Sequence, residues 1–377
     1  MAKQRIAYID AMRGFTMILV VYSHVCNYCL GDKWMGWNDV FFLFRLPCFF
    51  FISGWLFGSH RGTGPCVSSN ADDSGTVPSV RSVIKHKFMV QIVPTVIFLL
   101  LLAPPPLFFS KLGATKGGYW FTFALFEFFL ICIFSERYLK KYHGLLAVFI
   151  SIAAYCYDVY YARFEPSSLN YHCSLFTFHF SLSDILGFLG VITWRYYLFF
   201  YLGTLVKRHF DVFLKWTGKP VVVTIVVIGF VLMAMNPRSE NVALEYLIFS
   251  VGGILGMMMV FTAFRYIYTT THLSLLTSHL SLLTSHLSLL TSHLSPLNYI
   301  GTRTLDIYLL HYFFLPRFLL AYAPQLSAYD NRLLEFIIAF AIALVVVAIC
   351  LLASYIIRLN PFLGNILFGV KRNNTTS

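Results

Sequence analysis

Ten long apolar stretches constrain the fold of this 377-residue chain more than any other feature. Most are close to the roughly 20 residues that a helix needs to cross the hydrocarbon layer of a bilayer. They are apolar on all sides, whereas the strands of a membrane barrel alternate apolar and polar residues. The stretches are Ala11–Tyr28, Trp37–Phe57, Met89–Phe109, Tyr119–Phe134, Gly144–Tyr161, Ile185–Val206, Val221–Met235, Leu244–Phe264, Leu305–Tyr322 and Leu333–Ile357. We therefore predict an all-α fold, a polytopic integral membrane helix bundle with about ten transmembrane helices.

The composition excludes the other classes of protein. Only 12% of the residues are charged and 58% are hydrophobic, whereas soluble domains carry about 25% charged residues. Such a chain has too little polar surface to cover a water-soluble globule, and it is too hydrophobic to be disordered. Its eight Cys are spread over the whole length, which excludes a small disulfide scaffold.

The positive charge of the chain indicates its orientation. The net charge is +12, and most of the 28 Lys and Arg residues fall on the inner side if both termini are cytoplasmic. Cytoplasmic loops of membrane proteins carry this excess of basic residues. We therefore predict cytoplasmic termini and a lipid bilayer as the partner of the bundle, and we expect no nucleic acid partner.

We predict a single domain over residues 1–377, with two unusual segments. Residues 60–82 are rich in Gly, Ser and Asp and are typical of a flexible cytoplasmic loop. Residues 271–295 hold a heptad repeat, in which HLSLLTS occurs three times without a change, within a predicted cytoplasmic loop. The perfect identity favours a recent duplication of 21 nucleotides over selection on the side chains.

The sequence predicts no metal site. The His residues of the repeat are two helical turns apart, about 10 Å, which is too far for two of them to share one zinc ion. Cys26 and Cys29 have the spacing of metal ligands, but no second pair lies nearby in the sequence. We interpret both as apolar filler.

The first span carries the densest set of polar residues, and charged groups within a span are costly enough to be candidate functional groups. Asp10 and Arg13 lie at its inner edge, and His24 lies eleven residues beyond Arg13. Eleven residues make about three helical turns, or about 16 Å, so Arg13 and His24 share a face. A cytoplasmic anion bound by Arg13 can therefore extend toward His24. The alternative is that Arg13 reaches lipid phosphate while His24 packs with a hydrogen bond.

Other polar residues lie within later spans. Arg45 is in the middle of the second span and needs a carboxylate or a bound anion, and Glu127 in the fourth span is a candidate partner. The ninth span holds Asp306 and His311. We favour a structural role for both, and His311 is also a candidate for lining a cavity within the bundle. Trp120 lies near the outer end of the fourth span, where a Trp is normally an interfacial anchor.

Three segments together resemble a known family. They are RIAYIDAMRGFTMILVVYSHV at residues 5–25, FRLPCFFFISGWLF at 44–57 and YIGTRTLDIYLLH at 299–311. The chain is similar to the membrane-bound acyltransferase 3 family, and within it to the bacterial branch described as fucose 4-O-acetylase-like. The resemblance implies a multi-pass protein of the bacterial cytoplasmic (inner) membrane. It also implies transfer of acetyl from cytoplasmic acetyl-CoA, with no bound cofactor, to hydroxyls of cell-surface or lipid-linked glycans. With such an acceptor, Trp120 becomes a candidate for stacking on the sugar.

The resemblance also implies roles for individual residues. His24 would take the proton of the attacking hydroxyl, or would briefly carry the acetyl group itself. Arg13, held by Asp10, would orient the donor, and Lys85 and Lys87 would attract the phosphates of CoA. Where the family often has an Arg-x3-Arg motif, this chain has Lys87 and Gln91. Lys offers a point charge in place of a planar fork of donors, and Gln offers no charge.

Two other functions suit the same features. A transporter or flippase for a glycan or acyl precursor would also have about ten spans with buried Arg and His. Transporters often consist of two similar halves, and no matching halves are evident in this sequence. An inactive relative that serves as a partner subunit is the third possibility.

Overall fold

The computed structural model describes residues 6–31, 35–59, 80–102, 116–164, 186–187, 189–235, 241–276, 296–327 and 331–369. These residues form helices, turns and short connections, and none of them is in a β-strand, so the all-α prediction is confirmed for this part of the chain. The chain divides into two compact units, which are described separately. The first comprises Met1–Ile52 with His209–Tyr355, and the second comprises Ser53–Arg208 with Ile356–Ser377.

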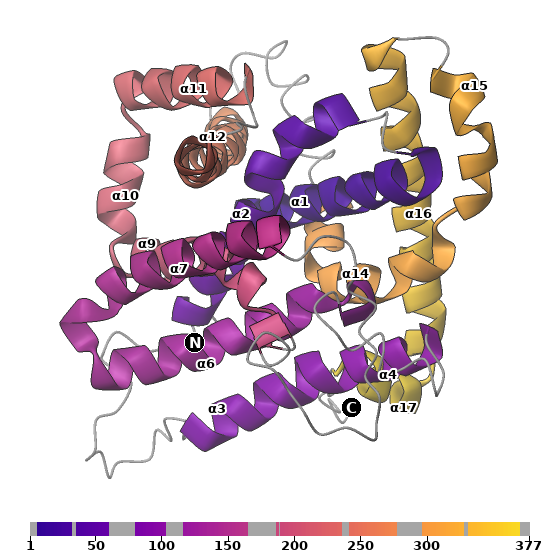
Figure 1. Ribbon diagram of the computed structural model, residues 1–377, viewed down its shortest axis with the longest axis horizontal. Helices are drawn as coiled ribbons and strands as arrows, with labels where there is room; N and C mark the ends of the chain where they lie inside the picture. The colour runs from indigo at the N-terminus through magenta and orange to yellow at the C-terminus, as the bar shows by residue number, and fades with distance from the viewer. Residues whose placement is uncertain are drawn as a thin grey trace. The chain divides into compact units, whose positions relative to one another are not determined.

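The first unit is built mainly from long helices (Figure 1). Its elements are α1 (Ala7–Val25), the π-helical turn η1 (Cys26–Leu30), most of α2 (Met35–Ser59), α10 (Phe210–Thr217), α11 (Pro220–Met235), α12 (Val242–Leu276), α14 (Thr304–Phe314), the 3-10 turn η7 (Arg317–Tyr322), α15 (Ala323–Ser327) and most of α16 (Arg332–Leu359). A further helix covers residues 296–302 and leads into α14.

The second unit contains shorter helices with several turns of other types. Its elements are the end of α2, α3 (Val80–Lys87), the π-helical turn η3 (Phe88–Ile92), α4 (Val93–Leu102), the 3-10 turns η4 (Lys116–Gly118), η5 (Lys140–Tyr142) and η6 (Val191–Tyr196), α6 (Trp120–Tyr138), α7 (His143–Phe164), α9 (Tyr197–Arg208), the end of α16 and α17 (Pro361–Phe368). Aromatic rings pack together in its interior. The ring centroid of Phe129 lies 4.8 Å from that of Phe57 and 5.4 Å from that of Phe200.

Three helices begin at asparagine residues whose side chains cap them. Asn241 precedes α12, Asn331 precedes α16, and Asn360 precedes α17. Each side-chain oxygen accepts hydrogen bonds from the two backbone N–H groups found two and three residues further on. These N–H groups have no partner within a helix, so an Asn at this position fixes where the helix begins.

Six described helices are long and apolar enough to cross a membrane, and a seventh span results if α10 and α11, bent by 80° at their junction, count as one (Figure 1). The predicted span Leu305–Tyr322 is interrupted, because α14 ends at Phe314 and Leu315 is extended in front of Pro316. The predicted span Ile185–Val206 is also divided, into η6 and the 12-residue α9. The structure supports six or seven spans, and the prediction of about ten with cytoplasmic termini stays a prediction.

Large apolar side chains cover the outside of several helices. They are exposed along α7, α11 and α16, for example at Leu145, Phe149, Ile225, Val345 and Leu352. Monomeric soluble proteins rarely expose contiguous apolar patches of this kind. A surface facing lipid tails explains them, because hydrocarbon is as apolar as these side chains.

The first helix crosses the helix over residues 296–302 at very short range. A Cβ built on Gly14 would lie 2.1 Å from the carbonyl oxygen of Leu297, and one built on Gly301 would lie 1.9 Å from that of Asp10. No side chain fits at either position, so each glycine allows the opposite backbone to approach. Both glycines belong to segments that resemble the family, and their contact holds the helix before α14 against α1.

The two unusual segments lie largely outside the described residues. Within the predicted loop 60–82, residues 60–79 are not described, and residues 80–82 form the first turn of α3, so the predicted loop ends earlier than residue 82. Within the repeat region 271–295, the backbone of α12 continues to Leu276. The rest of the repeat is outside the described residues.

We expect Gly14→Ala and Gly301→Ala to destabilise the protein by about 1–3 kcal/mol each, because an added methyl group in a tight contact forces the helices apart. The measurement is the midpoint of thermal unfolding in detergent. Gly252→Ala in α12 is the matched control, since its Cβ would meet side chains only at ordinary contact distances of 3.5–3.8 Å. Equal midpoints for Gly301→Ala and Gly252→Ala would contradict the close crossing.

Candidate active site

Two histidines from distant parts of the sequence meet in the first unit. His24 lies in the last turn of α1 and His311 in the last turn of α14. Their ring centroids are 5.0 Å apart, and the ring planes are inclined by 36°. His311 is completely buried, whereas His24 keeps part of its surface exposed. One imidazole of this histidine pair is therefore held inside the unit while the other stays accessible.

The hydrogen bonds of His311 determine which of its nitrogens carries the proton. Its Nδ1 lies 2.7 Å from the carbonyl oxygen of Tyr308 and 3.2 Å from that of Ile307. Carbonyl oxygens only accept hydrogen bonds, so Nδ1 must donate. In the neutral ring Nε2 then carries a lone pair. This Nε2 is buried and has no hydrogen-bond partner among the described residues.

His24 has a similar buried nitrogen. Its Nδ1 has no hydrogen-bond partner in the described part of the chain, and its Nε2 lies 3.4 Å from the hydroxyl of Tyr312. The ring of Tyr28 stacks on His24 with a centroid distance of 5.6 Å. Buried polar atoms are usually paired in native proteins, so two such nitrogens in neighbouring rings make the histidine pair a candidate site.

Arg45 has a polar partner on its own helix. It is 7% exposed, and its Nη1 donates to the side-chain oxygen of Asn38 at 2.6 Å and to the Asn38 carbonyl at 3.2 Å. Asn38 in turn donates to the side-chain oxygen of Asn27 at 3.4 Å, three residues after His24. The guanidinium also lies 5.5 Å from the ring centroid of Phe42. This set of contacts ties Arg45 to the end of the first span.

Asp306 has the structural role that the sequence favoured. It is 2% exposed and accepts a hydrogen bond from the hydroxyl of Ser354 in α16. Its carboxylate also lies 3.8 Å from the Nη1 of Arg303. These contacts tie the first turn of α14 to its neighbours, which helps to fix where His311 lies.

Asp10 and Arg13 lie in the first two turns of α1, and both are partly buried. The helix continues without a break from Ala7 to Val25, so Arg13 and His24 are related by the three turns that the sequence predicts. The holding of Arg13 by Asp10 stays a prediction.

The predicted donor-binding lysines belong to the second unit. Lys85 is exposed on α3, and the Nζ of Lys87 lies 4.5 Å from the ring centroid of Phe129. Gln91 lies in the π-helical turn η3, where its carbonyl accepts a hydrogen bond of 2.6 Å from Thr95. Turns of this kind are rare and often occur at functional sites.

Glu127 and Trp120 also lie in the second unit, on α6. Glu127 accepts a hydrogen bond of 2.8 Å from the indole of Trp194, so it and Arg45 each have a polar partner within their own unit. Burial lowers the pKa of Lys116, and the nearby Glu127 carboxylate opposes that shift. The ring of Trp120 stacks on Tyr196 with a centroid distance of 6.0 Å, so one of its faces already has an aromatic neighbour.

A family model for an acyltransferase domain, that of the acyltransferase 3 family, matches residues 6–355, nearly the whole chain. The chain belongs to the acyltransferase 3 family. It is a membrane acyltransferase, and the histidine pair lies within the matched region. The acyltransferase matches no curated protein and no solved structure.

Two neighbours of the histidine pair in this acyltransferase were not predicted from the sequence, namely Tyr28 and Tyr312. The Asn38 amide that accepts from Arg45 was not predicted either. Tyr28 is four residues after His24 and so lies on the same helical face, which is a signal that the sequence does contain. Tyr312 and Asn38 gain their places only through tertiary packing.

We expect Asn38→Leu to lower the stability of the acyltransferase by about 1–3 kcal/mol, because the buried Arg45 loses the side-chain oxygen that accepts its hydrogen bond at 2.6 Å. The midpoint of thermal unfolding in detergent should fall by several degrees. Asn365→Leu on α17 is the control, since Asn365 is exposed. An unchanged midpoint for Asn38→Leu would show that Arg45 does not depend on this amide.

Proposed function

We propose that this membrane acyltransferase moves an acetyl group from cytoplasmic acetyl-CoA to a hydroxyl of a cell-surface or lipid-linked glycan. The resemblance to the fucose 4-O-acetylase-like branch supports this donor, this class of acceptor and a place in the bacterial inner membrane. The single observation that carries the proposal is the histidine pair, which sets two imidazoles with unpartnered nitrogens side by side in the matched region.

The reaction needs a base beside the attacking hydroxyl. His24 takes the proton of the sugar hydroxyl while the hydroxyl oxygen attacks the thioester carbonyl of acetyl-CoA. The C–S bond of the resulting tetrahedral intermediate then breaks, and the leaving thiolate takes the proton back from His24. The products are the acetylated sugar and free CoA. His24 is the better of the two histidines for this step, because it is only partly buried whereas His311 is completely buried.

His311 acts as a positioning residue in this scheme. Two backbone carbonyls hold its Nδ1–H, so its ring orientation and tautomer are fixed. The ring centroids of His311 and His24 are 5.0 Å apart, and in this scheme the lone pair on His311 Nε2 stabilises a protonated His24 more than a second N–H would. The Tyr312 hydroxyl, 3.4 Å from His24 Nε2, limits the rotation of that ring.

The donor is held by basic residues in the proposal. Arg13 orients the acetyl-CoA beneath His24, and Asp10 keeps Arg13 in place. Lys85 and Lys87 attract the phosphates of CoA, and the exposure of Lys85 suits that role. Trp120 and Glu127 of the second unit and Arg45 and His311 of the first are each proposed to contact the acceptor sugar.

Replacing His24 by Ala should reduce the acetylation rate by about 10²–10⁴-fold, the usual contribution of a general base. Release of the CoA thiol by the purified protein in lipid vesicles measures the rate, with acetyl-CoA and a panel of sugar glycosides that includes fucose. His209→Ala is the matched control, because His209 is exposed between α9 and α10. An inserted His24→Ala protein that works at the wild-type rate would rule out His24 as the base.

The same assay separates the competing functions. Movement of the glycan across the vesicle membrane without thiol release would identify a transporter or flippase. Binding of CoA to the wild-type protein without turnover would identify an inactive relative. Thiol release with formation of an acetylated sugar supports the proposed acetyltransferase.

Replacing both Lys85 and Lys87 by Ala should raise the KM for acetyl-CoA about tenfold and leave kcat within twofold. Contacts to the CoA phosphates are the same in the ground state and the transition state, and such contacts change KM alone. Steady-state kinetics with varied acetyl-CoA gives both constants. Lys215→Ala, at an exposed position of α10, is the control. An unchanged KM in the double variant would remove these lysines from the donor site.

A further inference from the structure

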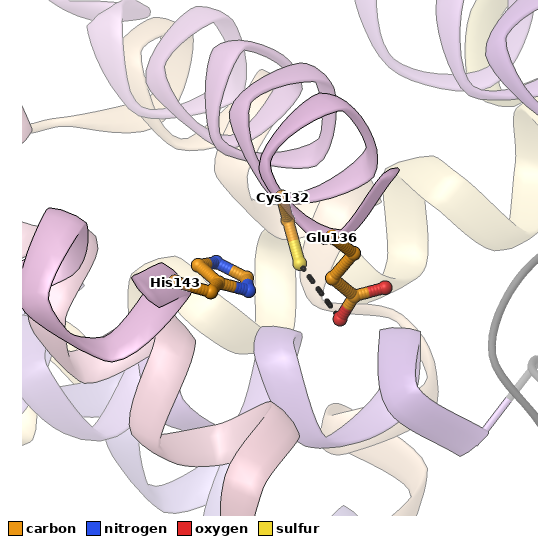
Figure 2. A group of neighbouring side chains, drawn as sticks. All are labelled: Cys132, Glu136 and His143. Carbon is orange, nitrogen blue, oxygen red and sulfur yellow. Dashed lines mark hydrogen bonds between the residues drawn. The ribbon is translucent and has the colours of Figure 1, made fainter. Parts of the chain in front are cut away.

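Three side chains of metal-binding type meet in the second unit, apart from the histidine pair. Cys132 and Glu136 lie one turn apart on α6, and His143 begins α7 (Figure 2). Their ligand atoms all lie within 4.8 Å of one another. The sulfur of Cys132 is 3.7 Å from Oε1 of Glu136.

The reversal of the chain between α6 and α7 brings the third side chain to the other two. Cys132 and Glu136 are four residues apart, so they share one face of α6. Lys140 adopts a positive φ of 30°, and the backbone N–H of Tyr142 bonds to the carbonyl of Leu139. The tight turn returns His143 to the same face, where its imidazole faces the thiol and the carboxylate (Figure 2).

The three residues are shielded from solvent. Cys132 is completely buried, His143 is 2% exposed, and the side chain of Glu136 is 11% exposed. The hydroxyl of Tyr197 lies 2.8 Å from His143 Nε2, and the ring of Tyr201 packs on the imidazole at a centroid distance of 4.5 Å. Metal ligands are typically oriented by hydrogen bonds and packing of this kind.

We propose that Cys132, Glu136 and His143 bind a divalent metal ion of the zinc class. Thiolate, imidazole and carboxylate are the three ligand types that zinc accepts in proteins. With Zn–S of about 2.3 Å and Zn–O of about 2.1 Å, tetrahedral geometry puts the sulfur and the oxygen about 3.6 Å apart. The 3.7 Å between Cys132 and Glu136 fits this value. Three protein ligands leave the fourth position to water.

The charges around the site are compatible with a cation. Zinc displaces the proton of the Cys132 thiol, so its two charges are balanced by one thiolate and one carboxylate. Arg208 forms an ion pair with Oε1 of Glu136, the same oxygen that lies 3.7 Å from the Cys132 sulfur. Each oxygen of an ionised carboxylate has two lone-pair positions, so Oε1 can accept from the guanidinium and bind the metal as well. The guanidinium then orients the carboxylate from outside the metal's own ligands.

The site would tie α6 to α7 at the point where the chain reverses. This inference does not depend on the proposed acetyl transfer, since none of its three residues takes part in that reaction. It departs from the sequence-based expectation of no metal site, which rested on the Cys26–Cys29 pair and the histidine repeat. The ligands proposed here are separated by a turn whose course the sequence does not reveal.

The test is metal analysis of the purified full-length protein in detergent. After incubation with Zn²⁺ and dialysis against metal-free buffer, we expect about one zinc per chain. Substitution with Co²⁺ should produce the absorption bands of tetrahedral cobalt together with thiolate charge-transfer bands. Cys132→Ser and His143→Gln should lose the zinc and the charge-transfer bands, while Cys156→Ser, at an exposed position of α7, should retain both.

Two results would overturn the proposal. The first is wild-type protein that keeps no zinc and gives no cobalt spectrum. This result does not depend on whether any variant folds. The second is Cys132→Ser protein that elutes as a single species in size-exclusion chromatography and retains zinc like the wild type. Loss of zinc from Cys132→Ser but not from Cys156→Ser supports the site, whatever the outcome of the acetylation assay.

Discussion

The contact between two glycines, Gly14 and Gly301, is the constraint on which the candidate active site depends. Each lies where a Cβ would be about 2 Å from a backbone oxygen of the other helix, so the two backbones pack directly on each other. Helices in a membrane gain little from burying apolar side chains, and close backbone packing between small residues is the interaction that holds them together. Because α14 begins three residues after Gly301, at Thr304, this crossing fixes where His311 lies along α1, next to its last turn. The ties of Asp306 to Ser354 and Arg303 add polar contacts in the same region.

The buried charged groups and the histidine pair of the first unit differ in how their hydrogen-bonding capacity is satisfied. Arg45 and Asp306 have hydrogen-bond partners close by, as costly buried charges require. The imidazoles of His24 and His311 instead each keep a buried nitrogen without a hydrogen bond in the described structure. An arrangement that satisfies its charges and leaves two bases unsatisfied suits a site that binds and releases protons. The family match shows an acyltransferase, and in the O-acetyl transfer that we propose, such a base takes the proton of the attacking hydroxyl.

Much of this protein was predictable from local patterns. The all-α class followed from ten apolar stretches, and the positions of Arg13 and His24 on one helical face followed from their spacing. The number of spans was less predictable. Pro316 interrupts the stretch after α14, and the region before α9 forms a 3-10 turn, although both regions are apolar enough to read as continuous spans. The hydrophobicity of a segment indicates that it can lie in lipid or in a protein interior. It does not indicate whether the backbone is helical along the whole segment.

The sequence alone determined the class of fold, the membrane environment and the first-span histidine, because each of these depends on residues that are close together in the chain. The tertiary structure decided that His24 meets His311, that Arg45 bonds to Asn38, and that Cys132 and Glu136 share a face with His143. The first pairing joins residues 287 positions apart, and the last depends on one tight turn at Lys140. Contacts of this kind are set by how helices cross and how chains reverse, and those geometries follow from packing across the whole unit.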